Sequence, residues 1–273
     1  MQFHTASDGT QIHVHTVGEG SDVVLIHGWP LNHQMWESQL RPLVESGHRV
    51  TTYCRRGFGH SDKPWNGYDY DTFADDLRTV MTGAKVENAA LVGFSMGGGE
   101  IARYMSRHGG QGVSRAVLIS SVAPFMLKTD DNPDGVPESV FEEMKAGLVK
   151  DRPAFLAEFN QDFFGQGTEA GGTSEAMMEW ARGIAMQGSL KATVDCVDAF
   201  GKTDFRPDMA SFKVPTLVIH GTADKTVPIE VSGQAAAKAI DGAELVQYEG
   251  APHAVFETHT DSLNQDLVSF LKH

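Results

Sequence analysis

Apolar residues in this chain alternate between short continuous runs and longer stretches with helical spacing. The runs are too short for helices and are typical of strands buried on both faces of a parallel sheet. They cover residues 22–28, 48–54, 89–94, 115–121, 215–221 and 243–248. Stretches with apolar residues three and four positions apart lie between most of them, such as 34–45 and 70–84. This alternation predicts βαβ units and a mostly parallel sheet with helices on both faces.

The first residues show a different pattern, in which polar and apolar side chains alternate. Residues 1–6 and 11–17 flank a turn at Ser7-Asp8-Gly9-Thr10, which predicts a hairpin and raises the expected number of strands to eight. His13 and His15 fall on one face of the second strand. Since no third ligand accompanies them in the sequence, we interpret both as solvent-facing strand positions and expect no metal site. Helix 34–45 is expected to be broken or adjusted near Pro42.

From residue 124 to residue 213 the strand pattern stops. Helix-like stretches replace it, separated by turns that contain Gly and Pro, at 138–150, 153–163, 174–186 and 190–201. We therefore predict an α/β core formed by residues 1–123 and 214–273, and a helical cap at 124–213, inserted after the sixth strand. The cap is rich in Phe and Met, so some of its side chains should line a pocket between cap and sheet. Phe125 and Phe159 are the candidates from this segment.

Composition and charge narrow the class of protein. The 273 residues are 41% hydrophobic and 21% charged, which suits a globular fold, and the formal net charge is −14. An acidic surface would be repelled by nucleic acid and by anionic membranes, so neither is expected as a partner. The start of the chain lacks the features of a signal peptide, no apolar run approaches membrane-spanning length, and there are only two cysteines, Cys54 and Cys196. We expect a cytoplasmic protein.

The strongest chemical signal is Gly93-Phe94-Ser95-Met96-Gly97, which follows an apolar strand and precedes a helical pattern. A strand, a sharp turn and a helix around Gly-x-Ser-x-Gly hold the serine in a strained conformation, with its hydroxyl above the end of the strand. Flanking glycines are needed because a Cβ atom there would collide with neighbouring backbone. Ser95 is therefore the candidate nucleophile.

A serine nucleophile needs a base and an acid that orients the base, in the chain order Ser, Asp or Glu, His. His253 follows the last strand in a turn constrained by Pro252 and is the candidate base. Asp224 follows the preceding strand and is the candidate acid, with Asp130 or Asp131 as the alternative. Loops at the carboxyl ends of parallel strands share one rim of the sheet, so these side chains can converge. His220, at a strand end, is expected to be buried for structural reasons.

Acyl transfer also needs donors for the developing oxyanion. The backbone N–H of Met96, directly after the nucleophile, is one candidate, and that of Trp29, in the loop after the third strand, is the other. Pro30 has no N–H and cannot serve.

Taken together, these segments resemble the α/β-hydrolase superfamily and, more narrowly, its cofactor-free haloperoxidase, aryl esterase and γ-lactamase branch. The matching motifs are His27-Gly28-Trp29-Pro30, Arg55-Arg56-Gly57-Phe58-Gly59-His60-Ser61-Asp62, Gly93-Phe94-Ser95-Met96-Gly97-Gly98-Gly99, His220-Gly221-Thr222-Ala223-Asp224 and Ala251-Pro252-His253. The resemblance extends over nearly the whole chain, including the cap. It implies Ser95, Asp224 and His253 as the catalytic residues and Trp29 and Met96 as the oxyanion donors.

The resemblance also implies an activity. Members of the branch hydrolyse small, often aryl or short-acyl, esters through an acyl-enzyme, and many let hydrogen peroxide replace water, giving a peracid that oxidises bromide or chloride. They use no metal, haem or other cofactor, and they often form homo-oligomers. Related dehalogenases and epoxide hydrolases carry aspartate in place of Ser95. The sequence leaves two alternatives open: a γ-lactamase or amidase with the same residues, and a binding protein with slow turnover on a hydrolase scaffold.

One departure from the branch concerns the pocket. Ala254 follows the base where relatives more often have Gly, which bears on the shape of the pocket. We therefore add Ala254 and Val227 to Phe125 and Phe159 as candidate substrate-pocket residues.

Overall fold

The computed structural model describes residues 2–272, in which eight strands form one sheet in the order β1-β2-β4-β3-β5-β6-β7-β8. The strands are β1 (Gln2–Thr5), β2 (Gln11–Val17), β3 (Ser21–Ile26), β4 (His48–Tyr53), β5 (Ala89–Phe94), β6 (Val113–Ile119), β7 (Thr216–Gly221) and β8 (Glu244–Tyr248). The pairings of β2 with β1 and with β4 are antiparallel, and all others are parallel. The predicted eight-stranded, mostly parallel sheet is confirmed.

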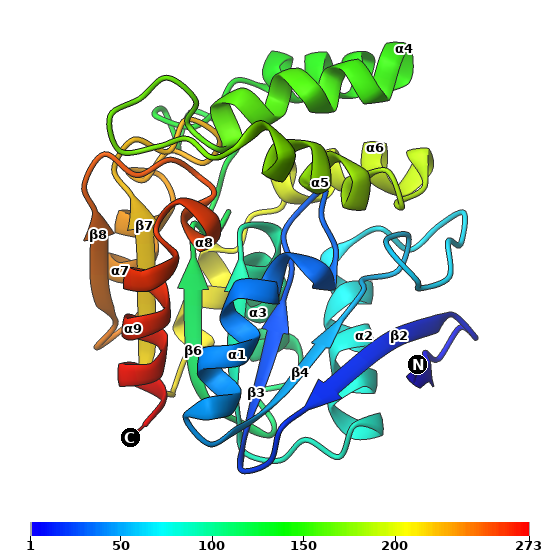
Figure 1. The fold of residues 1–273 in the computed structure, drawn as a ribbon, viewed down its shortest axis with the longest axis vertical. Coiled ribbons are helices and arrows are strands. Elements are labelled where there is room, and N and C mark those ends of the chain that lie inside the picture. Colours follow the sequence, from blue (N-terminus) through cyan, green and yellow to red (C-terminus); the bar gives the residue numbers. More distant parts are fainter. Residues whose placement is uncertain (1, 273) are drawn as a thin grey trace.

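Helices cover both faces of this sheet (Figure 1). Helices α1 (Glu37–Glu45) and α9 (Thr260–Leu271) pack together on one face, and α2 (Tyr70–Gly83), α3 (Met96–Arg107) and α7 (Gly233–Ala239) lie on the other. Every residue of β5 and of β7 is buried, as expected for strands with helices on both sides. None of the helices in residues 2–272 is both long enough and apolar enough to span a bilayer.

The segment between β6 and β7 forms a helical layer above the carboxyl ends of the strands (Figure 1). It contains α4 (Glu138–Phe163), α5 (Glu175–Ala185) and α6 (Leu190–Lys202). Helix α4 consists of two helical pieces joined at Asp151, whose backbone is non-helical and whose carboxylate accepts a hydrogen bond from Ala154 N at 3.0 Å. The two helices predicted there are therefore present, with Asp151 acting as the cap of the second.

The two ends of this helical layer meet. Phe205 N donates a hydrogen bond to Pro124 O at 2.8 Å, so the chain returns to the point at which it left the core. The 3₁₀ turn η2 (Arg206–Ser211) that follows packs on α3 of the core, where Arg103 forms an ion pair with Asp208 at 3.2 Å.

One local prediction was wrong. Helix α1 is not broken at Pro42: the carbonyl of Ser38, which loses its usual helical donor there, accepts a hydrogen bond from Asn264 Nδ2 at 3.1 Å. The irregularity lies earlier, where the 3₁₀ turn η1 (His33–Trp36) leads into α1. Helix α7 begins at Gly233, after a turn at residues 229–232 in which Ser232 Oγ donates to Pro228 O.

Candidate active site

Ser95 occupies the sharp turn between β5 and α3 with backbone angles φ 53° and ψ −117°. This conformation is rare for a residue with a side chain, and holding it costs about 1–3 kcal/mol, so the surroundings must enforce it. They do so through Ser95 N, which donates to Ile119 O of the neighbouring strand β6 at 2.8 Å, and Ser95 O, which accepts from Gly98 N at 2.9 Å. The predicted strained serine is confirmed.

The glycines around Ser95 are required by close backbone approaches. A Cβ atom on Gly93 would lie 2.5 Å from Gly97 O, and one on Gly97 would lie 2.4 Å from Ile26 O on strand β3. Real Cβ atoms do not approach backbone oxygen this closely, so any larger residue would push α3 away from the sheet.

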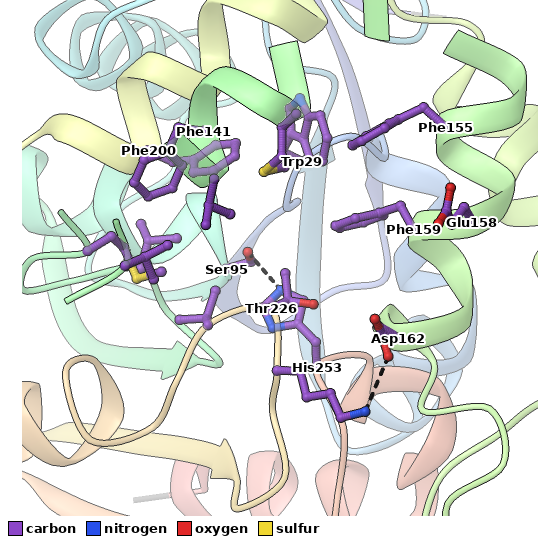
Figure 2. A pocket seen from close by; sticks show the side chains of 17 residues that line it. Trp29, Ser95, Phe141, Phe155, Glu158, Phe159, Asp162, Phe200, Thr226 and His253 are labelled. Carbon is purple, nitrogen blue, oxygen red and sulfur yellow. Dashed lines mark hydrogen bonds and ion pairs between the residues drawn. The ribbon is translucent and has the colours of Figure 1, made fainter. Parts of the chain in front are cut away.

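The structure brings Ser95, His253 and Asp224 into one hydrogen-bonded line. His253 Nε2 lies 2.9 Å from Ser95 Oγ, and His253 Nδ1 lies 2.6 Å from Asp224 Oδ2 (Figure 2 shows the first of these). The three residues follow β5, β7 and β8, whose carboxyl ends share one rim of the sheet. All three are buried, with His253 only 1% exposed. A serine, an imidazole and a carboxylate so arranged can transfer a proton from the hydroxyl to the ring.

The carboxylate of Asp224 is held by four donors. Its Oδ1 accepts from Thr226 N at 2.9 Å and Val227 N at 2.8 Å, while Oδ2 faces His253 and His220. Burial alone would raise the pKa of Asp224, but the charge of His253 and the hydrogen bonds from both histidines outweigh it and lower the pKa to about 2. The group is therefore ionised across the physiological range.

His220 is buried, as the sequence suggested, but it also touches the site. Its Nε2 lies 3.2 Å from Asp224 Oδ2 and 2.9 Å from Val227 O. The sequence carried a signal for this contact, since His220 and Asp224 are four residues apart across a tight strand-end turn. The alternative acids do not reach the site: Asp130 and Asp131 are exposed, and Asp131 pairs with Arg206 at 3.0 Å.

The two candidate oxyanion donors come from different elements. Met96 is the first residue of α3, where helical amides have no partner within the helix, and Trp29 lies in the loop after β3. Neither backbone N–H donates a hydrogen bond to an acceptor within residues 2–272. The side chain of Trp29 is fixed separately, because its Nε1 donates to Thr193 O of α6 at 2.9 Å.

Above the serine lies a cavity of about 310 Å³ (Figure 2). We call its floor, formed by Trp29, Ser95, Val227 and His253, the sheet wall. Its opposite side, which we call the helix wall, consists of Phe141, Phe155 and Phe159 from α4 and Phe200 from α6. The walls touch where Trp29 packs edge-on against Phe159, with ring centroids 5.4 Å apart.

Two of the four pocket candidates line this cavity, Phe159 and Val227, and two do not. Phe125 lies beneath Arg206, whose guanidinium is 4.7 Å from the ring centroid, so the expectation for Phe125 was wrong. Ala254 is fully buried and donates from its N to Phe163 O at 2.9 Å, so it packs behind the base instead of facing the cavity. The aromatic content of the cap predicted a pocket, but not which rings form it.

Charged side chains line the same cavity further from the serine. Glu158 and Asp162 come from α4 (Figure 2), and Lys225 comes from the loop after β7. Lys225 Nζ lies 3.4 Å from Asp162 Oδ1, and both side chains are largely exposed. An exposed pair of this kind contributes little to stability.

A second group of chemically active side chains lies away from this cavity. His13 is buried, not solvent-facing, and its ring nitrogen shares a small space with His33 and Cys54. The sequence did not reveal this grouping, because His33 and Cys54 come from segments that are distant from His13 in the sequence. His15 is exposed, as expected.

Comparison with known proteins gives consistent matches. The profile of the alpha/beta hydrolase fold family matches residues 23–260. The chain is 42% identical to the non-heme chloroperoxidase CPO-A1 of Kitasatospora aureofaciens, over 99% of each chain, and 37% identical to the bifunctional esterase/perhydrolase DCH of Acinetobacter calcoaceticus, over 100% of each. The crystal structure of bromoperoxidase from Bacillus anthracis superposes with a TM-score of 0.94 at 43% identity and covers 100% of both chains.

Proposed function

Because this chain belongs to the alpha/beta hydrolase family, we propose that it is a serine hydrolase that cleaves small carboxylic esters through an acyl-enzyme on Ser95. The observation that carries the proposal is the continuous line from Ser95 Oγ through His253 to Asp224, with distances of 2.9 and 2.6 Å. It unites a nucleophile, a base and an orienting carboxylate at the floor of a cavity.

In the first half-reaction, Ser95 Oγ attacks the ester carbonyl carbon while His253 Nε2 takes the hydroxyl proton. The carbonyl oxygen gains negative charge, and the N–H groups of Trp29 and Met96 are the proposed donors that stabilise it. When the C–O bond to the leaving group breaks, His253 gives its proton to the departing oxygen. The acyl group stays on Ser95.

Asp224 acts through His253. A hydrogen bond from Nδ1 to Asp224 Oδ2 leaves Nε2 unprotonated and facing Ser95 Oγ, and the negative charge stabilises the imidazolium that forms. The low pKa of Asp224, about 2, is consistent with a carboxylate that remains charged while His253 gains and loses its proton.

In the second half-reaction, His253 deprotonates water or hydrogen peroxide, which attacks the acyl carbon and releases Ser95. Water gives a carboxylic acid, and peroxide gives a peracid. A peracid then oxidises bromide or chloride to the hypohalous acid and is itself reduced to the carboxylic acid. The similarity of this chain to an esterase/perhydrolase, a chloroperoxidase and a bromoperoxidase supports the reaction with peroxide.

The cavity favours apolar acyl or aryl groups. Its helix wall presents four phenylalanine rings, and its volume of about 310 Å³ suits a small ester. Glu158, Asp162 and Lys225 line the same space, and Lys225 balances the charge of Asp162. We propose that residues 124–213 act as the cap that closes this cavity over residues 1–123 and 214–273.

For the wider setting, we propose a cytoplasmic enzyme whose partners are small molecules, without nucleic acid or membrane partners. The formal charge of −14 supports this proposal. The proposal of a homo-oligomer rests on the resemblance alone, and light scattering on the purified protein tests it.

The decisive experiment measures two activities on the parent, Ser95→Ala and Ser120→Ala. One is hydrolysis of p-nitrophenyl acetate, and the other is bromination of a dye with acetate, hydrogen peroxide and bromide. Ser120→Ala is the matched control, because Ser120 is also buried at a strand end and its Oγ has no hydrogen-bond partner in the described residues. Circular dichroism verifies the fold of each variant.

We expect both activities in the parent and the control and neither in Ser95→Ala. A parent that leaves esters intact would refute the esterase proposal and direct attention to lactams, amides or non-catalytic binding. Bromination that survives in Ser95→Ala would show that halide oxidation does not pass through the acyl-enzyme.

A further inference from the structure

A second cavity, of about 440 Å³, lies on the side of the molecule formed by β2 and the loops after β3 and β4. Four histidines line it: His13, His15, His33 and His60. In the sheet, β4 and β3 separate β2 from β5, which precedes Ser95, and none of these histidines lines the cavity above Ser95. The chemistry of this cavity is therefore independent of the proposed esterase activity.

Two of these lining residues, His13 and His33, lie next to the buried Cys54. His33 Nδ1 lies 3.0 Å from Cys54 Sγ, His13 Nδ1 lies 3.8 Å from the same sulfur, and each of the three residues offers one ligand atom within 4.8 Å of the others. In a tetrahedral zinc site with Zn–N of about 2.0 Å and Zn–S of about 2.3 Å, nitrogen and sulfur ligands lie about 3.5 Å apart. The two measured distances lie on either side of that value.

The backbone holds these ligands in place. Cys54 N donates to His13 O at 3.0 Å, and Ser61 joins the same two residues: its Oγ donates to Cys54 O at 2.6 Å and accepts from His13 N at 2.8 Å. Gly59 makes room for the sulfur, because a Cβ atom there would lie 2.4 Å from Cys54 Sγ. The arrangement therefore does not depend on a metal to assemble it.

His33 comes from a third element, and its position is also fixed. It begins the 3₁₀ turn η1, which Asn32 caps by accepting a hydrogen bond from Gln34 N at 3.0 Å. The exposed His60 lies further out, with its ring centroid 5.0 Å from that of His13 and 6.2 Å from that of His33.

Binding of a divalent ion at these atoms would displace the thiol proton of Cys54, because sulfur coordinates a metal as the thiolate.

We propose that His13 Nδ1, His33 Nδ1 and Cys54 Sγ bind a zinc-class divalent cation, with His60 or a water molecule as the fourth ligand. Two imidazoles and a thiolate are the donor set that zinc prefers over calcium or magnesium. The ion would link strand β2, turn η1 and the loop after β4, and so stabilise this edge of the sheet. It would take no part in acyl transfer, and the site runs against the expectation from the sequence that the chain binds no metal.

The test uses Co²⁺ as a spectroscopic probe on protein first dialysed against a chelator. Tetrahedral Co²⁺ with a thiolate ligand shows visible d–d bands and a sulfur-to-cobalt charge-transfer band. We expect both bands to saturate at one Co²⁺ per chain and to disappear when Zn²⁺ is added. Binding of the ion should release one proton. Zn²⁺ at 100 times its Kd should raise the folded-to-unfolded ratio about 100-fold, seen as a higher Tm.

Four variants locate the ion. Cys54→Ser and His33→Gln remove ligands, and each should weaken binding by about 100-fold or more, since even loss of an outer partner of a metal ligand costs 10- to 100-fold. His15→Gln alters the same cavity without touching the three ligand atoms, and His108→Gln alters a histidine that pairs with Asp75 elsewhere. Both controls should bind as the parent does. Metal-free Cys54→Ser should give the same circular dichroism spectrum as the metal-free parent, which verifies its fold.

Three outcomes would overturn the proposal: no stoichiometric binding of Co²⁺ or Zn²⁺ below millimolar concentration, a charge-transfer band that persists in Cys54→Ser, or equal weakening in His15→Gln and Cys54→Ser. The last would mean that the ion binds the outer histidines. None of these outcomes bears on the esterase proposal, and failure of that proposal leaves the cobalt spectra unaffected.

Discussion

The two walls of the cavity above Ser95 are built from different interactions. On the sheet wall, Ser95 and His253 are joined by a hydrogen bond of 2.9 Å, and behind this wall Asp224 lies 2.6 Å from His253 and has further donors from the backbone. On the helix wall, the phenylalanines touch one another through ring contacts only, such as the stacked pair Phe155 and Phe159 with centroids 6.1 Å apart.

Because of this difference, we expect the two walls to control two different properties of the enzyme, its rate and its choice of substrate. Hydrogen bonds are directional, so the sheet wall has one working geometry, and small errors in it are costly. Contacts between aromatic rings are tolerant of small shifts, so the helix wall can change its shape without disturbing the reacting groups. We expect substitutions on the sheet wall to lower kcat and those on the helix wall to alter the choice of substrate.

The largest effect should come from comparing two carboxylates that are each replaced by the amide: Asp224, which holds His253 of the sheet wall, and Asp162, which lies on the same helix as Phe159 of the helix wall. Asp224→Asn cannot stabilise the imidazolium and favours the wrong tautomer of His253, so kcat for p-nitrophenyl acetate should fall by about 10⁴-fold. Asp162→Asn, on α4, should change kcat by less than about threefold, because the charge of this exposed side chain is well screened by solvent. Similar losses in both variants would erase the distinction between the walls.

A pair of glycines tests the same contrast through stability. A Cβ atom on Gly97, beneath the sheet wall, would lie 2.4 Å from Ile26 O, so Gly97→Ala should lower the free energy of unfolding by about 3 kcal/mol or more. A Cβ atom on Gly183, in α5 of the helical layer, would have no other atom within 4 Å. Gly183→Ala should therefore raise the free energy of unfolding by about 0.5–1 kcal/mol. Urea denaturation measures both.

The free energy of unfolding should depend on pH through Asp224. Its pKa is lowered from 3.8 to about 2 in the fold, so ionised Asp224 contributes its full stabilisation above about pH 4 and loses it as the pH falls toward 2. The shift in pKa corresponds to a contribution of about 2 kcal/mol to the free energy of unfolding. The difference in free energy of unfolding between the parent and Asp224→Asn should shrink over that interval. A constant difference from pH 6 to pH 2 would argue against an ionised, stabilised Asp224.

The smallest effect is expected on the helix wall. Phe159→Ala removes a ring that packs against Trp29 and enlarges the cavity. The ratio of kcat/KM for p-nitrophenyl octanoate to that for the acetate should therefore rise about 10-fold, while the pH profile of kcat stays unchanged. Phe3→Ala, on exposed β1, is the control. A shifted pH profile would show that the helix wall also tunes His253.

What the sequence predicted well was local. Buried parallel strands appear as apolar runs, and Gly93-Phe94-Ser95-Met96-Gly97 encodes its own turn, because Gly93 and Gly97 are the positions at which a Cβ atom would strike backbone. The convergence of Ser95, Asp224 and His253 follows from parallel strands ending at one rim, so it could be predicted without knowing side-chain positions.

What the sequence did not predict depends on contacts between distant segments. Phe125 and Phe155 are both aromatic cap residues, and only the packing of the helices decides that Phe155 faces the cavity. Pro42 lies within an intact helix because Asn264, on α9, donates to the freed carbonyl of Ser38, 226 residues away in sequence. The grouping of His13 with Cys54 likewise arises from the pairing of β2 with β4.

The hydrogen bond between Pro124 O and Phe205 N has an evolutionary consequence. Because the helical layer leaves and rejoins the core at one point, it can be lengthened, shortened or exchanged without stretching the sheet. The helical layer can therefore diverge during evolution while Ser95, His253 and Asp224 are inherited unchanged. For the same reason, residues 124 and 205 are the natural junctions for grafting the helical layer of one hydrolase onto the sheet of another.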